Sequence, residues 1–227
     1  MKKTLISLSL LTLISCSKNE KEINSNQSSI NNKLVVLSVD ISQSFKLPNI
    51  DSNKIRQLCK ALETSSRNAT VIIYPLGNPS KNPKVLTCKI EGLQTKYKGL
   101  TLSQKKHAVL KNKKIALSNK KAIDKFLDNY QSQIYNIPRT AHTDIRSFNS
   151  WLYTLSNEDQ FKNYEKTLLL YSDGINSIKG HDEFYPLKKS IEDLTIFTCG
   201  LDEATKPYTQ DYKEITSPNS FFNQYKI

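Results

Sequence analysis

The stretch LVVLSVDISQS, residues 34–44, decides the predicted fold of this chain. Its first six positions hold five aliphatic side chains, interrupted only by Ser38. A continuous apolar run of this length indicates a strand that is buried on both faces. Asp40, Ser42 and Ser44 then place small oxygen-bearing side chains at alternate positions. We therefore expect the central strand of a covered sheet, ending in an oxygen-rich segment.

Apolar runs of strand length alternate with longer amphipathic stretches along the rest of the chain. This alternation is typical of β-α-β units and predicts an α/β domain with a mostly parallel sheet. The expected strands are residues 33–40, 69–77, 83–92, 167–174 and 195–201. The expected helices are residues 51–66, 101–135 (as one or two helices), 145–155, 184–194 and a short one within 215–227.

Two of these regions carry more specific expectations. Pro75 and Gly77 are expected to stop the second strand. The strand at residues 83–92 follows a short turn that contains glycine and proline, so we expect an antiparallel pair there. The expected apolar side of the helical region 101–135 consists of Ala108, Leu110, Ile115, Ala116, Ala122, Ile123, Phe126 and Leu127.

Residues 1–16 predict an export signal. Lys2 and Lys3 precede an apolar run, TLISLSLLTLIS, that is too short for an ordinary membrane-spanning helix. The run ends in Leu-Ile-Ser-Cys, which resembles a bacterial lipobox, and this resemblance implies that Cys16 becomes a lipidated first residue. A cleaved signal without a lipid and a plain membrane anchor are the alternatives. Residues 17–32 are polar and poor in apolar side chains, so we expect a flexible tether.

These features place the protein in a bacterial cell envelope, anchored by its lipid to the outer membrane and facing the periplasm or the outside. Export argues against nucleic acid as a partner. The formal net charge is +12, and thirteen lysines lie between Lys81 and Lys125. Such a surface suits phosphates, anionic lipid headgroups or an acidic protein, although a charged helix face is more often simply solvated.

Three cysteines remain for the domain at residues 33–227, namely Cys59, Cys88 and Cys199. An odd number excludes a closed set of intramolecular disulfides, and the spacing does not show which two would pair in an oxidising compartment. The sequence contains no Cys-x-x-Cys motif and no clustered pattern of His and Cys. It therefore argues against a zinc site.

Oxygen-bearing side chains follow two of the expected strands. Asp40 ends the first, and Asp173 ends the strand at residues 167–174. Between them in sequence lies a loop that contains Thr140 and Thr143. The carboxyl ends of parallel strands meet at one edge of a sheet, where ligands bind. A set of aspartate, serine and threonine oxygens there would suit a hard divalent cation.

Three motifs together resemble the metal-ion-dependent adhesion site of von Willebrand factor A domains. They are Asp40-Ile41-Ser42-Gln43-Ser44, Thr143-Asp144-Ile145 and Tyr171-Ser172-Asp173-Gly174. The resemblance covers residues 33–227, because the order of strands and helices also fits. It implies a three-layer sandwich of the von Willebrand factor A or Rossmann-like kind, with one antiparallel edge strand in an otherwise parallel sheet.

The resemblance also implies roles for individual residues. Ser42 and Ser44 would be direct metal ligands, Asp40 and Asp173 would lie at or just behind them, and Thr143 would join or leave the metal when a partner binds. Mg²⁺ is the expected cation, with Ca²⁺ or Mn²⁺ as alternatives, and a carboxylate of a partner protein would complete its coordination.

Two threonines compete for one position in this set. Thr140 competes with Thr143, because Arg139-Thr140 also resembles the family's loop. The family usually has glycine just before the threonine, whereas Ala141 and His142 precede Thr143 here.

The sequence thus predicts a lipid-anchored, exported module that binds a protein partner through a divalent cation, and not an enzyme. One alternative is a metal-independent scaffold or assembly component of an envelope machine that uses the lysine-rich helices. A second is a metal-dependent hydrolase that uses the same oxygen cluster. For that reaction the sequence offers no general base or nucleophile beyond Asp144 and His142.

Overall fold

The computed structural model describes residues 31–77, 84–177, 183–184, 191, 193–205 and 211–225. Six strands form one sheet in the order β3-β2-β1-β4-β7-β8, and all neighbours are parallel except β2 and β3. Their bounds are β1 Asn32–Asp40, β2 Asn68–Leu76, β3 Leu86–Glu91, β4 Tyr164–Tyr171, β7 Leu194–Cys199 and β8 Lys213–Glu214. β5 (Ile175–Asn176) and β6 (Glu183–Phe184) form a small antiparallel pair.

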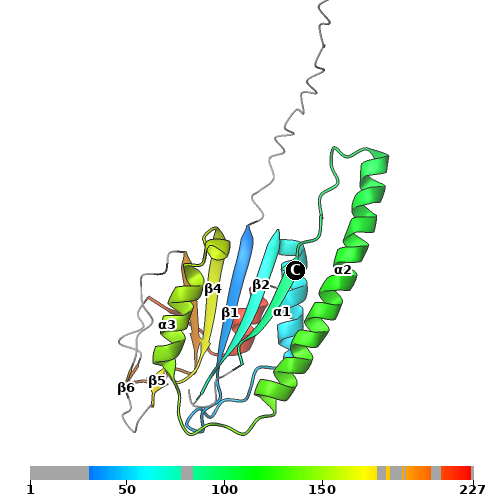
Figure 1. Cartoon of the computed structure of the whole chain (residues 1–227). Coiled ribbons are helices and arrows are strands. Elements are labelled where there is room, and N and C mark those ends of the chain that lie inside the picture. Colours follow the sequence, from blue (N-terminus) through cyan, green and yellow to red (C-terminus); the bar gives the residue numbers. More distant parts are fainter. Residues whose placement is uncertain are drawn as a thin grey trace, which may run out of the picture.

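Helices cover both faces of the large sheet. Figure 1 shows α1 and α2 on one side of the strands and α3 on the other. The helix bounds are α1 Ser52–Ser65, α2 Leu102–Tyr130, α3 Ile145–Ser156 and α4 Pro218–Asn223. A π-helical turn at Gln131–Tyr135 continues α2, and a short 3₁₀ turn at Asp159–Phe161 follows α3. The predicted α/β three-layer architecture with an antiparallel third strand is confirmed.

β1 is the central strand, and its side chains explain why its sequence shows no alternation. Val35, Leu37 and Val39 belong to the core between the sheet and α1, α2 and α4. Leu34 and Val36 belong to the core between the sheet and α3. Since both faces of the strand are buried, both must be apolar.

The helix starts follow from local side-chain chemistry. Asp51 caps α1 and accepts a hydrogen bond from the backbone N–H of Asn53. Thr101 and Gln104 form a reciprocal capping box at the start of α2. From this start, α2 continues without a break to Tyr130, so the lysine-rich region is one helix of 29 residues and not two.

Two sequence expectations are wrong in detail. Pro75 does not stop β2, which runs to Leu76. The pairing of β3 with β2 ends at Ile73, so no β3 neighbour needs the N–H that proline lacks. Leu110 is not on the buried side of α2, because it lies about 200° around the helix from the buried Ala108 and is 59% exposed.

The short helix expected near the C-terminus is present as α4. The helix expected at residues 184–194 falls largely outside the described residues. Within that range Phe184 belongs to β6 and Leu194 begins β7. The export signal, Cys16 and nearly all of the expected tether also lie outside the described residues. No helix in the described part of the chain is long and apolar enough to cross a membrane.

The three described cysteines are buried, reduced thiols. Cys59 on α1 and Cys88 on β3 hydrogen-bond to each other through their side chains. Cys199 ends β7 at the other side of the sheet. The pair with contacting thiols, which the spacing left open, is therefore Cys59 and Cys88.

Candidate metal centre at the carboxyl ends of the strands

The three predicted motifs converge at one edge of the sheet. The parallel register of β1 and β4 brings Asp40 and Ser172 side by side where the two strands end. The loop before α3 reaches the same edge, where Thr140 forms a bridge with Ser42. Segments more than a hundred residues apart in sequence therefore meet here.

Asp40 is the centre of this group and is fully buried. Its Oδ1 accepts a hydrogen bond from the backbone N–H of Ser42 at 2.8 Å. Its Oδ2 accepts one from the Ser172 hydroxyl at 2.6 Å. The Thr143 hydroxyl donates to the same carboxylate, at 3.3 and 3.4 Å from its two oxygens. Asp40 thus fixes the positions of the other members.

Asp173 and two serines complete the group. The hydroxyls of Ser42 and Ser44 lie 3.0 Å apart. The hydroxyls of Ser44 and Ser172 lie near the Asp173 carboxylate and lower its pKa, and Asp173 Oδ1 accepts a hydrogen bond from the backbone N–H of Ile175 at 3.0 Å. Ser44 is exposed and Asp173 half-buried, so the group opens to solvent on their side. We call it the strand-end cluster; its members are Asp40, Ser42, Ser44, Thr143, Ser172 and Asp173.

The two carboxylates make the cluster electrostatically unfavourable without a cation. Burial raises the pKa of Asp40, and hydrogen bonds from Ser172 and Ser42 offset part of this increase. The negative charge of Asp173 raises the Asp40 pKa further. Burial also raises the pKa of Asp173, and nearby Asp202 adds to that effect. A bound cation would favour the charged form of both carboxylates.

No ion pair in the described part of the chain neutralises these carboxylates. The described pairs are Lys33–Glu165, Arg56–Asp124, Lys60–Glu63 and Lys162–Asp159. Arg139 comes close to the cluster, but its guanidinium donates to the backbone carbonyls of Ser42, Phe45 and Leu47. It therefore holds the loop after β1 in place without supplying a counter-ion to the aspartates.

The donor set fits a hard cation. Two carboxylates and four hydroxyls provide only oxygen, which is the ligand type of Mg²⁺, Ca²⁺ and Mn²⁺. Among the described residues, no group of three or more His, Cys, Asp and Glu side chains could hold a metal ion. The strand-end cluster is of a different kind, because most of its oxygens are hydroxyls.

The two candidate threonines have different surroundings. The Thr143 hydroxyl is fully buried and reaches Asp40. The Thr140 hydroxyl instead donates to the backbone carbonyl of His142 at 2.9 Å, within its own loop. Thr140 contributes through its backbone, which pairs with Ile41 and Gln43 at 2.8 Å each. The geometry therefore favours Thr143 as the member of the cluster.

Sequence reasoning missed the residues that position Thr143 and α3. The Ser177 hydroxyl accepts a hydrogen bond from the Thr143 backbone N–H at 2.9 Å. The Asn176 side chain accepts one from the N–H of Ile145, at the start of α3, at 3.0 Å. Both residues lie just after Asp173 in sequence, but only the fold shows which element they contact.

The two groups considered for hydrolysis have structural roles. Asp144 caps α3 and accepts a hydrogen bond from the backbone N–H of Ser147 at 2.8 Å. His142 is half-buried, and its carbonyl accepts the hydrogen bond from Thr140. Neither contact orients a nucleophile or a general base toward the strand-end cluster.

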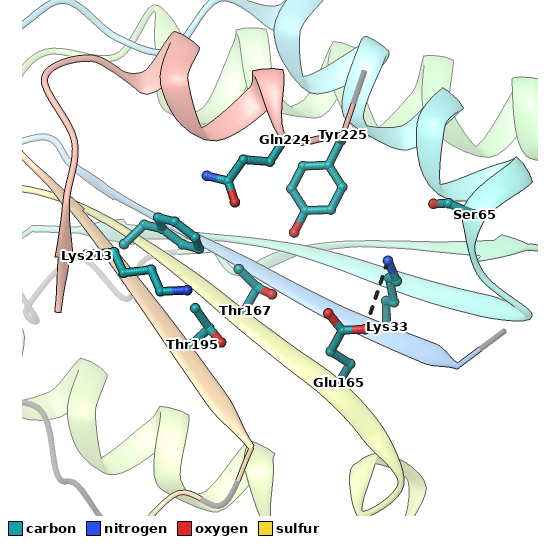
Figure 2. A pocket seen from close by; sticks show the side chains of 9 residues that line it. Lys33, Ser65, Glu165, Thr167, Thr195, Lys213, Gln224 and Tyr225 are labelled. Carbon is teal, nitrogen blue, oxygen red and sulfur yellow. Dashed lines mark ion pairs between the residues drawn. The ribbon is translucent and has the colours of Figure 1, made fainter. Parts of the chain in front are cut away.

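A separate cavity of about 310 Å³ lies near the opposite ends of the strands. Figure 2 shows Lys33, Glu165 and Thr195, near the starts of β1, β4 and β7, facing Tyr225 across it. Lys33 and Glu165 form an ion pair of 4.0 Å there. None of the predicted site residues lines this cavity.

Comparison with known proteins gave only structural likenesses. No family model matches the chain, and no curated protein matches it. Among solved structures, a manganese-loaded TRAP protein of Plasmodium vivax is 12% identical with a TM-score of 0.43, over 86% of this chain and 72% of that one.

Two further structures are similar at the same level. Proximal thread matrix protein 1 of the mussel byssus is 11% identical with a TM-score of 0.46, over 86% of this chain. The pilus adhesin SpaC of Lactobacillus rhamnosus GG, in an open conformation, is 11% identical with a TM-score of 0.41, over 88% of this chain. The matches span 46% and 30% of those two proteins. At these identities and TM-scores, no property of any of the three is transferred to this chain.

Proposed function

We propose that this protein is a binding module whose strand-end cluster holds a divalent cation, Mg²⁺ in the first place, and through it a carboxylate of a protein partner. When bound, the cation would offer an open position to that carboxylate, because neutral hydroxyl ligands compensate little of its charge. No catalytic step belongs to this proposal.

One observation carries the proposal. Two aspartates share a largely buried group of hydroxyls. Burial raises the pKa of each aspartate, although hydrogen bonds to each carboxylate lower it. Natural structures pair buried charges with an opposite charge or a metal. Here the described ion pairs involve neither Asp40 nor Asp173.

The proposed role of each residue depends on how exposed its side chain is. Ser42 and Ser44 would contribute hydroxyl oxygens, with Thr143 as the third hydroxyl. Asp40, fully buried, orients Ser42, Thr143 and Ser172 through its hydrogen bonds. Asp173 and Ser44 lie on the open side, where a partner's carboxylate would enter.

The same proposal includes the location of the protein. The export signal and the lipobox-like segment ending at Cys16 would anchor the chain in a bacterial cell envelope. A lipid on Cys16 would hold the domain near the membrane, within the reach of a tether of about 16 residues, at most roughly 55 Å. Mass spectrometry of protein recovered from the envelope checks the lipid on Cys16.

Thermal unfolding with and without cations tests the metal site directly. An ion present at 100 times its Kd should stabilise the native protein by about 2.7 kcal/mol relative to excess chelator. Asp173→Asn should lose this increase, because it removes the carboxylate on the open side of the cluster. Asp159→Asn is the matched control, since Asp159 is exposed and its ion pair among the described residues is with Lys162.

A chelator-reversible pull-down from envelope extract tests the partner. Wild-type protein should retain the partner in Mg²⁺ and release it in excess chelator, and Asp173→Ala should retain none. Partner binding that persists in chelator and weakens steeply with salt would instead support the metal-independent scaffold. No change of unfolding temperature with Mg²⁺, Mn²⁺ or Ca²⁺ would reject the metal site itself.

A further inference from the structure

Half of the large exposed hydrophobic side chains of the described residues lie on one helix, α2. They are Leu102, Val109, Leu110 and Leu117, which are 71%, 44%, 59% and 58% exposed. With 100° per residue, the four fall within an arc of about 100° on the helix surface. The side chains that α2 buries, such as Ala108 and Ile115, lie on another side. The exposed four therefore form a second apolar stripe.

Lysines share this arc with the apolar side chains. Lys106 and Lys113 fall between Leu102 and Leu117 in angle as well as in sequence, and Lys120, three residues after Leu117, lies at the same angle as Leu102. α2 holds eight lysines and two aspartates, and both aspartates are in its last two turns. We call the mixed surface the α2 outer stripe; its members are Leu102, Lys106, Val109, Leu110, Lys113, Leu117 and Lys120.

The outer stripe belongs to a well-formed part of the protein. The capping box of Thr101 and Gln104 fixes the start of the helix. Asn112 holds the preceding loop against α2, since its amide donates to the Gln94 carbonyl and to the Tyr97 hydroxyl, each at 2.8 Å. A rigid helix therefore presents the stripe, so that its side chains point to solvent together.

The position of the stripe is also informative. Figure 1 shows the amino-terminal part of α2 extending beyond the strands at the end of the molecule where β1 begins. The strand-end cluster lies at the opposite end, because it follows the last residue of β1. Chain that precedes Asn32 therefore enters the domain at the same end as the projecting part of α2.

We propose that the α2 outer stripe lies against an anionic phospholipid surface, with its apolar side chains at the level of the acyl-chain boundary and its lysines at the headgroup phosphates. An interfacial helix needs both kinds of side chain, since aliphatic groups alone would not select anionic lipid and lysines alone would not enter the interface. The choice of a membrane rests partly on the lipid anchor of the proposed function, since the chain that leads to Cys16 joins the domain at the end where β1 begins.

The stripe and the cluster would then act at the same time. With α2 lying along the membrane, the cluster would lie at the edge of the domain, at the ends of the strands far from the start of α2, and would stay open to a partner. This arrangement adds an orientation to the proposed function, because the lipid on Cys16 would limit distance without fixing which side of the domain faces out.

Sedimentation with lipid vesicles tests the stripe without any divalent cation. The probe is the chain from residue 16 onward, without the apolar export signal and with Cys16→Ser, in chelator, with vesicles of phosphatidylcholine alone or mixed with phosphatidylglycerol. Phosphatidylglycerol should increase binding, and Lys106→Glu with Lys113→Glu should lower binding to the anionic vesicles by about tenfold or more. Leu110→Ser with Leu117→Ser should lower it severalfold while net charge stays the same.

A charge-matched control separates the stripe from net charge. Lys89→Glu with Lys162→Glu removes the same four units of charge from exposed positions outside α2, and should lower binding much less. Equal losses for the two lysine pairs would overturn the proposal, as would unchanged binding in the leucine variant. Tighter binding to an acidic polypeptide such as polyglutamate than to anionic vesicles, insensitive to the leucines, would assign the stripe to a protein partner instead.

Because every arm contains chelator, these outcomes do not depend on the cation site. If the vesicle experiment contradicts the membrane proposal, the proposed cation site is not affected. If the strand-end cluster binds no cation, the expected vesicle binding does not change.

Discussion

The two ends of the sheet are built in opposite ways. At the carboxyl ends of the strands, six small side chains from three segments hydrogen-bond to one another and are mostly buried. At the other end, the α2 outer stripe takes all its side chains from one helix and exposes them. The first surface depends on the rest of the fold for its geometry, whereas the second needs only a helix.

This difference sets how each end should respond to mutation. A change in the strand-end cluster leaves buried partners without hydrogen bonds and so should cost folding free energy. The four apolar side chains of the outer stripe are 44–71% exposed, so a change there should cost little folding free energy. The predictions below test that contrast, from the largest expected effect to the smallest.

Replacing Asp40 should have the largest effect. Asp40→Ala leaves the hydroxyls of Thr143 and Ser172 and the N–H of Ser42 without their acceptor, and should lower the free energy of unfolding by roughly 2–4 kcal/mol. Urea denaturation in chelator measures it.

Asp40→Asn is the matched variant, because it keeps an oxygen acceptor but not the charge. It should retain most of the stability and lose the stabilisation by Mg²⁺. If Asp40→Ala is as stable as the wild type, the hydrogen bonds of the cluster do not support the fold.

Two glycines provide a comparison at nearly equal φ. Gly174, after Asp173, has φ +82°, and Gly99, before α2, has φ +84°. Gly99→Ala should cost about 1–2 kcal/mol from the left-handed conformation alone, since no atom lies within 4 Å of the added Cβ.

Gly174→Ala should cost about 1 kcal/mol more, because its Cβ would lie 2.9 Å from a methyl carbon of Leu201. Urea denaturation of both variants gives the difference. Equal losses of unfolding free energy in the two variants would show that Leu201 moves aside to accommodate the added methyl group at no extra cost.

Alkaline pH should destabilise the strand-end side. Burial raises the pKa of the Cys199 thiol to about 11, and burial likewise raises the pKa of the Tyr171 hydroxyl to about 12. The native state then holds its protons at a pH at which the unfolded chain releases them, so stability should fall as pH rises from about 9 to 11.

Melting curves across this range measure the effect, and Cys199→Ala should make the decline shallower. If stability declines as steeply with pH in Cys199→Ala as in the wild type, the loss at alkaline pH comes from other groups. Tyr130 is one such group, because burial also raises its pKa.

Changes in the outer stripe should have the smallest effect on stability. Leu110→Ser with Leu117→Ser should alter the free energy of unfolding by no more than about 0.5 kcal/mol per site, because both side chains are exposed. Urea denaturation checks this and also serves as the folding control for the vesicle experiment. A loss above 2 kcal/mol, roughly what a buried leucine would cost, would mean that the stripe packs against protein.

Much of the fold was predictable because the signals are local. The runs at residues 34–39 and 167–171 are apolar on both faces, which indicated central strands. The short turn before residues 83–92 indicated the antiparallel pair of β2 and β3. The errors arose where a neighbouring element decides the outcome: Pro75 is tolerated because β3 ends before reaching it, and Leu110 lies outside the arc that faces the sheet.

The candidate site was predictable in composition but not in arrangement. Asp40, Ser42, Ser44, Thr143 and Asp173 were identified by motif, and the structure brings all five together with Ser172. The support of Thr143 by Ser177, and of α3 by Asn176, had no signal in the sequence. Whether the cluster binds a cation, and whether Cys16 carries a lipid, remain predictions for the experiments above.

The sequence by itself determined β1 to β4, β7, the four α-helices and the residue types that end β1 and β4, because hydrophobic periodicity and capping act over a few neighbouring residues. Only the tertiary structure decided that Asp40 meets Thr143 and Ser172, that the Cys59 thiol contacts Cys88, and that α2 projects at the end opposite the cluster. These relations depend on strand order and register, which pair residues far apart in sequence and leave no local pattern behind.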